Sequence, residues 1–204
     1  MKFIDLSHTF TPLMPVFPGD SKMSLIVAAT MKKDGYINHL LTSGMHVGTH
    51  IDAPLHFIPG GKRISDISLD RFYGEAKVID VRGKSIIDVD VLEHIDLVKD
   101  DIVLFFTGYD RFYGKQDYFV NHPVLTDSLA QRLVDVGVKM VGVDMGSPDK
   151  YPFAIHNLLL RNDILILENL TNLEMVGDKP FELFAFPIKF ETDAAFVRTI
   201  AKVV

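Results

Sequence analysis

Three histidines and an aspartate are concentrated in one short stretch of this 204-residue chain, which reads HVGTHIDAPLHF over residues 46–57. Because the chain contains eight histidines, a window of eleven residues would hold only about 0.4 of them by chance. In an extended strand, side chains alternate between two faces, and one face would then carry all four polar groups: His46, His50, Asp52 and His56. Neutral imidazole and carboxylate groups suit zinc, manganese or iron. We therefore interpret the stretch as a metal-binding strand.

A straight strand could not form a metal site by itself. It would spread the four groups over about 30 Å, whereas ligand atoms lie about 2 Å from a metal. We expect the chain to bend at Gly48 and Pro54, and other elements to supply further ligands. The candidates are His156, in a predicted helix, and Glu168, at the end of the apolar run DILILE. Either residue alone would more often be structural, but together they complete a candidate ligand set.

The composition excludes several classes of function. The net charge of −6 and the absence of a basic block argue against nucleic acid as a partner. The chain contains no cysteine, so any metal must be held by nitrogen and oxygen ligands. The chain has no run of about 18 apolar residues that could span a membrane. Asp5 interrupts the apolar region that a signal peptide would need. We expect a cytoplasmic protein with a small-molecule substrate.

The hydrophobic pattern predicts an α/β protein. Helices are predicted at residues 88–98, with Asp88 as the N-cap, and at 126–136 and 153–161. Strands are predicted at residues 2–6, 23–30, 38–45, 76–81, 101–107, 139–144, 163–168, 181–190 and 196–203. Alternating strands and helices in the second half predict a parallel sheet segment covered by helices. No linker divides the chain, so residues 1–204 are expected to form one domain.

The chain resembles the cyclase-like metal-dependent hydrolases, a family that includes bacterial kynurenine formamidase and isatin hydrolase. The family signature H-x-G-T-H-x-D-x-P-x-H is complete here as HVGTHIDAPLH. Further matching segments run through most of the chain: FIDLSHTF, PVFPGD, FFTGYDRFYG, VGVDMGSPD and LENLTNL. The resemblance implies a single compact domain with a mixed, barrel-like β-sheet and flanking helices, of the swivelling β/β/α type. It also implies a homo-oligomer, expected to be a homodimer or homotetramer.

The resemblance assigns metal ligands residue by residue. The first two motif histidines and the aspartate bind one metal in that family, which implies His46, His50 and Asp52. The aspartate and a later glutamate bridge to a second metal held by a later histidine, which implies Asp52, Glu168 and His156. The resemblance thus implies one or two divalent cations per chain, with Zn²⁺ expected and Mn²⁺ as the alternative.

The resemblance also assigns catalytic and substrate-binding residues. The last motif histidine is the proton donor and acceptor, which implies His56. Bacterial kynurenine formamidases usually carry a tryptophan in the first loop that contacts the substrate, and this chain has Phe17 at that place. They also tend to end in a Gly-x-Asp-x-Ser-Pro-Val-Arg segment, whereas this chain reads ETDAAFVR over residues 191–198. Neither difference from the family pattern affects the metal ligands. Both differences bear on which substrate is bound.

The expected reaction follows from a metal and a neighbouring histidine. A bound divalent cation lowers the pKa of coordinated water from about 15.7 to near 7, which supplies hydroxide for attack on an amide carbonyl. We expect an arylformamidase acting on N-formyl-L-kynurenine. Hydrolysis of a cyclic amide or lactone is the alternative within the same chemistry. A metal-assisted isomerase or lyase, and a metal-binding protein without turnover, are the alternatives of other classes.

Overall fold

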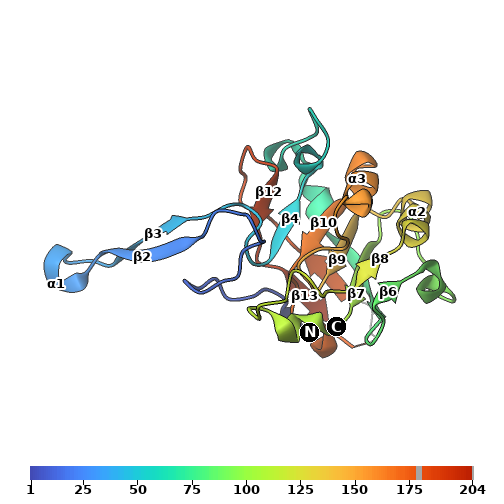
Figure 1. The fold of residues 1–204 in the computed structure, drawn as a ribbon, viewed down its shortest axis with the longest axis horizontal. Coiled ribbons are helices and arrows are strands. Elements are labelled where there is room, and N and C mark those ends of the chain that lie inside the picture. Colours follow the sequence, from blue (N-terminus) through green and yellow to red (C-terminus); the bar gives the residue numbers. More distant parts are fainter. Residues whose placement is uncertain (178–180, 204) are drawn as a thin grey trace.

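The apolar run IVLFF forms β7 (Ile102–Phe106), the central strand of a nine-stranded sheet in the computed structural model, which describes residues 1–177 and 181–203 (Figure 1). All five residues of β7 are buried, as expected for a strand that is covered on both faces. Alternate side chains from Ile102 onward enter one apolar cluster, whereas Val103 and Phe105 enter a second. The sheet therefore has a core on each of its faces.

The sheet is mixed and curled. Its strand order is β1-β13-β11-β5-β7-β9-β10-β4-β12, in which β5, β7, β9 and β10 are parallel and all other neighbours are antiparallel. The other strands of this sheet are β1 (Lys2–Asp5), β4 (His50–Asp52), β5 (Tyr73–Asp80), β9 (Met140–Val143), β10 (Leu165–Glu168), β11 (Phe181–Phe184), β12 (Ala194–Phe196) and β13 (Ile200–Val203). Two small two-stranded sheets pair β2 (Ser24–Ala29) with β3 (Asn38–Thr42) and β6 (Ile86–Ile87) with β8 (Val124–Leu125).

Two helices cover one face of the sheet. They are α2 (Asp127–Val136) and α3 (Ala154–Arg161), and their apolar side chains belong to the same cluster as Val103 (Figure 1). Helix α2 has the predicted ends, because Thr126 Oγ1 accepts a hydrogen bond from the Leu129 amide at 3.2 Å and Gly137 follows with φ of +78°. The remaining helices are α1 (Met31–Asp34) and the short 3₁₀ helices Pro54–His56, Ile64–Asp66, Leu69–Phe72, Val89–Leu92, Tyr109–Phe112 and Leu173–Met175.

The predicted helix at residues 88–98 is wrong beyond its first turn. Asp88 does accept a hydrogen bond from the Val89 amide at 2.7 Å, but only the 3₁₀ helix Val89–Leu92 follows. His94 then adopts φ of +68°, which ends the helical path. This segment is rich in β-branched residues and aspartates, which are weak helix formers, and burial is not available to compensate.

The last two predicted strands are also corrected. The strand expected at residues 181–190 ends at Phe184. The strand expected at 196–203 is divided between β12 and β13, which pair with different neighbours. The first loop holds the corner between them, because the Leu6 amide donates to Thr199 O at 2.9 Å and the Thr199 amide donates to Ser7 Oγ at 2.7 Å. Such long-range contacts are not visible in the hydrophobic pattern.

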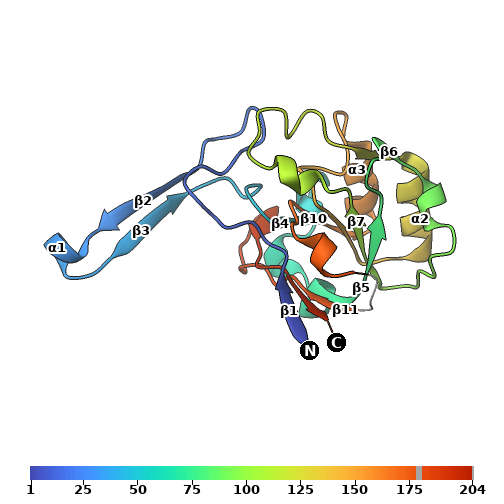
Figure 2. The ribbon, with the colours of Figure 1, turned by 90° about the horizontal axis from the view of Figure 1, so that it is seen from below.

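The predicted fold class is confirmed: the chain forms a compact α/β domain with a curled mixed sheet and few helices. Figures 1 and 2 show one departure from compactness, since the hairpin of β2, α1 and β3 extends far from the body. We call residues 24–42 the arm. Among the residues that the structure describes, no helix is long and apolar enough to cross a membrane. The extent of the domain over residues 1–204 stays a prediction.

Candidate metal centre

Strand β4 is the only extended part of the histidine-rich stretch, and it lies between β10 and β12. His50 and Asp52 are two residues apart and point to one face, while Ile51 points to the other and is fully buried. In the antiparallel pairing with β10, Glu168 lies directly opposite His50. Cross-strand partners share a face, so the sheet itself brings Glu168 to the two residues of β4.

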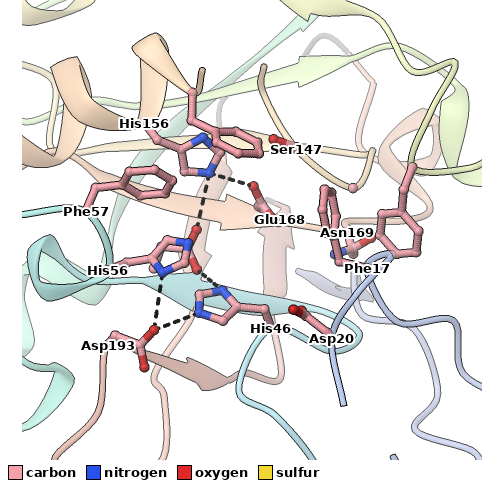
Figure 3. A pocket seen from close by; sticks show the side chains of 14 residues that line it. Phe17, Asp20, His46, His56, Phe57, Ser147, His156, Glu168, Asn169 and Asp193 are labelled. Carbon is pink, nitrogen blue, oxygen red and sulfur yellow. Dashed lines mark hydrogen bonds and ion pairs between the residues drawn. The ribbon is translucent and has the colours of Figure 1, made fainter. Parts of the chain in front are cut away.

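The stretch over residues 46–57 is extended only in β4, and the chain bends near both expected positions. Gly48 adopts φ of +66°, in the left-handed region that favours glycine. A short 3₁₀ helix begins at Pro54. The two bends turn the ends of the stretch back over β4, and the ring centroids of His46 and His56 lie 4.0 Å apart (Figure 3).

Helix α3 supplies His156 through its first turn. Asp149 accepts a hydrogen bond from His156 Nδ1 at 2.6 Å, and its other oxygen accepts from the backbone amides of Ile155 and His156. The imidazole is therefore held through Nδ1, and its Nε2 points toward two carboxylates. Nε2 lies 3.2 Å from Glu168 Oε1 and 3.6 Å from Asp52 Oδ2. A histidine that donates Nδ1–H to a carboxylate and presents Nε2 has the arrangement of a metal ligand.

The five predicted ligands lie close together around the Asp52 and Glu168 carboxylates. Asp52 Oδ1 lies 2.9 Å from His46 Nδ1 and 3.4 Å from His50 Nε2. His50 Nε2 also lies 3.4 Å from Glu168 Oε2. Two groups have donor atoms that all lie within 4.8 Å of one another and could hold a metal ion: His46, Asp52 and His56; and His50, Asp52 and Glu168. Asp52 belongs to both groups.

Four buried polar atoms of this cluster have no hydrogen-bond partner within residues 1–177 and 181–203. They are His50 Nε2, both carboxylate oxygens of Asp52 and Glu168 Oε1. A buried polar atom without a hydrogen-bond partner destabilises the folded state by about 1–3 kcal/mol. Four such atoms in one cluster indicate that a bound group normally contacts them. His50 Nδ1 donates to Gly48 O at 2.8 Å, which leaves a lone pair on Nε2. The donor set of imidazole and carboxylate atoms therefore fits a divalent cation.

The electrostatics of the cluster also favour a cation. Burial alone would lower the pKa of His46, but the Asp52 carboxylate and a hydrogen bond to Asp193 raise that pKa to about 10. Burial would likewise lower the pKa of His156, but the hydrogen bond to Asp149 and the nearby carboxylates of Asp52 and Glu168 hold that pKa well above its usual value. The carboxylates thus draw positive charge into the site, and a bound cation would take the place of these protons.

The cluster forms the floor of a cavity of about 280 Å³ that has an aromatic wall (Figure 3). Four phenylalanines from separate segments line it: Phe17, Phe57, Phe119 and Phe153. The ring of Phe17 lies 5.5 Å from that of Phe119 and 6.4 Å from that of Phe153, between ring centroids. Six of the seven predicted site residues line this cavity, and the seventh, His50, has its Nε2 3.4 Å from Asp52 Oδ1 in that lining. Such a wall suits a planar aromatic group.

Sequence reasoning missed two residues of the site. Asp193 Oδ2 accepts hydrogen bonds from His46 Nε2 at 2.9 Å and from His56 Nδ1 at 3.2 Å (Figure 3). It lies just before β12, whose pairing with β4 brings it across 137 residues of sequence, and no local pattern announces that contact. The second is Asp149, which precedes α3. An aspartate shortly before a helix start is a capping signal that could have indicated it.

Residues 4–150 match the family model described as "Putative cyclase", which covers more than half of the chain. The chain belongs to the cyclase family. The resemblance to the cyclase-like metal-dependent hydrolases is thereby confirmed. Two family relatives carry the name kynurenine formamidase. The one from Bacillus cytotoxicus is 33% identical over 98% of this chain and 97% of its own. The one from Geobacillus thermodenitrificans is 34% identical over 91% and 90%.

Solved structures agree with this cyclase assignment. Isatin hydrolase A from Ralstonia solanacearum has a TM-score of 0.90 at 23% identity, over 100% of this cyclase-family chain and 92% of its own. At that identity the likeness concerns the fold. A protein from Bacillus stearothermophilus described as a predicted metal-dependent hydrolase has a TM-score of 0.82 at 25% identity, over 98% and 97% of the two chains. The relatives of this chain are thus named as a formamidase and as hydrolases.

Proposed function

We propose that this protein is a metal-dependent hydrolase of a small amide, and specifically an arylformamidase that acts on N-formyl-L-kynurenine. One observation carries the proposal: buried ligand atoms without partners form the floor of a pocket walled by phenylalanines. An aryl ring would lie against the wall while its formamide carbonyl reaches the floor. The kynurenine formamidases that match nearly the whole chain support this substrate.

The metal would be held by five residues of the cluster. His46, His50 and Asp52 would bind one divalent cation, and Asp52 and Glu168 would bridge to a second bound by His156. Zinc is the preferred ion for this set of nitrogen and oxygen atoms, with manganese as the alternative. Each chain would bind one or two of these cations. When bound, a divalent cation supplies a water of pKa near 7 and polarises the carbonyl.

His56 would move the proton. Its side chain is 27% exposed, compared with 1% for His50 and 5% for His156, so it faces the pocket more openly than these two ligands. Asp193 accepts from Nδ1, which leaves Nε2 available to take a proton from the attacking water. The same nitrogen then delivers that proton to the leaving amine as the carbon–nitrogen bond breaks, and the products are formate and the free amine.

Phe17 would contact the substrate. It lines the pocket together with Phe119 and Phe153, which it contacts edge to face, and a substrate aryl ring would pack against these three rings. The segment that carries it, the first loop, ends at the base of the arm. Substitution of the wall can therefore change which aryl group fits without disturbing the ligands.

A second candidate function is the opening of a cyclic amide or lactone. The fold likeness to isatin hydrolase A and the presence of Phe17 rather than a tryptophan in the wall both favour it. The same floor would serve, since a ring-opening hydrolysis also needs an activated water and a proton for the leaving atom. The two candidates differ only in what the aromatic wall accepts.

The deciding experiment compares two substrates with one protein. Purified protein would be stripped with a chelator, reloaded with zinc or manganese, and supplied with N-formyl-L-kynurenine or isatin. We expect kynurenine release that chelation abolishes and metal restores, at a higher kcat/KM than isatin opening. Preference for isatin would move the substrate to cyclic amides. Metal-loaded protein without turnover of either substrate would contradict the proposal. The cytoplasmic location, a homodimer or homotetramer, and a place in tryptophan breakdown stay predictions.

A further inference from the structure

The first loop forms a tight turn beside the pocket. Residues 17–20 read Phe-Pro-Gly-Asp, and the Asp20 amide donates a hydrogen bond to Phe17 O at 3.0 Å. Proline in the second position and a glycine with φ of +101° in the third are typical of a type II turn. In such a turn the first and last Cα atoms lie within about 7 Å of each other. The turn therefore holds a carboxylate next to the phenylalanine that we propose to contact the substrate.

Asp20 lies at the open side of the cavity. It is exposed, yet it lines the same cavity as Phe17 and the metal cluster. Figure 3 shows its carboxylate directed toward that cavity. An aryl ring that packs against Phe17, with its formamide at the floor, has to direct its remaining substituents toward the mouth. A substituent of this kind would reach the Asp20 carboxylate.

The cavity presents negative charge to such a substituent. Four carboxylates line it: Asp20, Asp52, Glu168 and Asp193. None of the described residues in this lining is a lysine or an arginine. Asp52 and Glu168 are candidate metal ligands, and Asp193 accepts hydrogen bonds from two histidines. Within residues 1–177 and 181–203, no salt bridge or side-chain hydrogen bond involves the Asp20 carboxylate. The protein therefore leaves the charge of Asp20 available to a ligand.

We propose that Asp20 is a specificity residue that binds an ammonium group of the substrate, so that the protein prefers aryl formamides with a side-chain amine. This inference rests on the proposed function and adds the charge of the substrate to it. An ammonium group has three N–H donors, and its hydrogen bonds to a carboxylate are strengthened by charge. A substrate carboxylate would instead meet like charge at this position. N-formyl-L-kynurenine carries both groups, and its amine is the one that Asp20 would bind.

The test compares three substrates that differ in one group. The first is N-formylkynuramine, an aryl ketone whose side chain ends in a primary amine. The second has a hydroxyl and the third a carboxylate in place of that amine. For the zinc-loaded wild type we expect kcat/KM to fall in this order, by about two- to fivefold at each step at low salt, which is the range of an exposed ion pair. The differences should appear in KM and should shrink as salt screens the charges.

Variants of Asp20 show whether this carboxylate sets the order. Asp20→Asn should bring the ratio of kcat/KM between the amine and hydroxyl substrates close to 1, and Asp20→Lys should reverse the order in favour of the carboxylate substrate. Asp20→Glu keeps the charge and should keep the wild-type order. The matched control is Asp90→Asn, at an exposed carboxylate that does not line the cavity, and it should keep the wild-type ratios. An order that Asp20→Asn and Asp20→Lys leave unchanged would overturn the inference.

A binding measurement separates this inference from the proposed function. If none of the three formamides is hydrolysed, the proposed function fails, and calorimetric titration then tests Asp20 without turnover. The zinc-loaded protein should bind kynuramine about two- to fivefold more tightly than the same compound with a hydroxyl in place of the side-chain amine. Asp20→Asn should remove that difference. Equal binding of the two compounds by the wild type would refute the role of Asp20, whether or not the protein hydrolyses formamides.

Discussion

At the scale of single residues, the site is built from carboxylates that lack partners and histidines that have one. Asp52 has two buried oxygens without a hydrogen bond in the part of the chain that the structure describes. His50 and His156, by contrast, each have Nδ1 fixed by an acceptor and Nε2 directed at the carboxylates. This pattern of hydrogen bonds distinguishes a ligand cluster from an ordinary buried ion pair, in which the polar atoms of both partners would be hydrogen-bonded.

Substitution should separate metal binding from proton transfer. We expect Asp52→Asn to reduce metal per chain to less than half and turnover by about 100-fold or more, because a neutral amide bridges two cations poorly. His56→Ala should keep its metal and lose about 100- to 10,000-fold in kcat. Elemental analysis and the formamide assay measure both quantities. Asp90→Asn, at an exposed carboxylate, is the control and should change neither. Normal metal content in Asp52→Asn would contradict the bridging role.

At the scale of elements, the site depends on a three-residue strand held between two bends. β4 is short, but it pairs on both sides with β10 and β12. One neighbour brings Glu168, and the segment before the other brings Asp193. The bends at Gly48 and Pro54 then fold the flanking histidines over it. The same eleven residues in a straight strand could not converge on an ion.

The bend at Gly48 can be tested against a second glycine. Gly48 and Gly60 have φ of +66° and +72°, but only a Cβ on Gly48 would meet another atom, Met14 Cε at 2.6 Å. Both alanine variants should lose about 1–2 kcal/mol of unfolding free energy from backbone strain. Only Gly48→Ala should also weaken zinc binding, because it displaces His46. Urea unfolding and zinc titration give the two readouts. Equal zinc affinity in the two variants would show that the bend does not position the ligand.

At the scale of the whole molecule, the buried cluster lowers the free energy of unfolding unless a metal is bound. Without a cation, the buried oxygen and nitrogen atoms that lack hydrogen-bond partners destabilise the folded state. The carboxylates also raise the pKa values of His46 and His156, so that the protonated histidines balance part of the negative charge. A ligand that binds only the folded chain restores that loss. Global stability should therefore report on the occupancy of the site.

Thermal unfolding should show this coupling. Zinc at about 100 times its dissociation constant would contribute about 2.7 kcal/mol, which corresponds to a rise of roughly 5–10 °C in Tm for a chain of this size. The Asp52→Asn variant should show little rise, because it lacks the carboxylate that the bound cations would share. Differential scanning fluorimetry with and without chelator measures these shifts. A wild-type Tm that zinc does not change would argue against a buried metal site.

Local signals account for what the sequence by itself determined about this protein. The ligand-bearing stretch could be recognised because its polar groups lie within eleven residues, and its bends because Gly48 and Pro54 restrict the backbone locally. The ends of α2 were predictable for the same reason, since Thr126 and Gly137 act on amides and carbonyls within one turn. The buried strand β7 was visible as an unbroken apolar run.

Tertiary structure decided the rest, because strand pairing joins residues that are far apart in sequence. The register of β4 determines that Glu168 faces His50 and that Asp193 reaches His56, and neither contact leaves a local pattern. The failure of the helix at residues 88–98 shows the converse, since a correct cap at Asp88 did not extend a helix that lacked support from packing. The exposure of the arm likewise depends on tertiary structure, because the body of the protein does not pack against either face of it. Alternation along β2 and β3 indicates a strand, but only the folded body shows that neither face of the arm is covered.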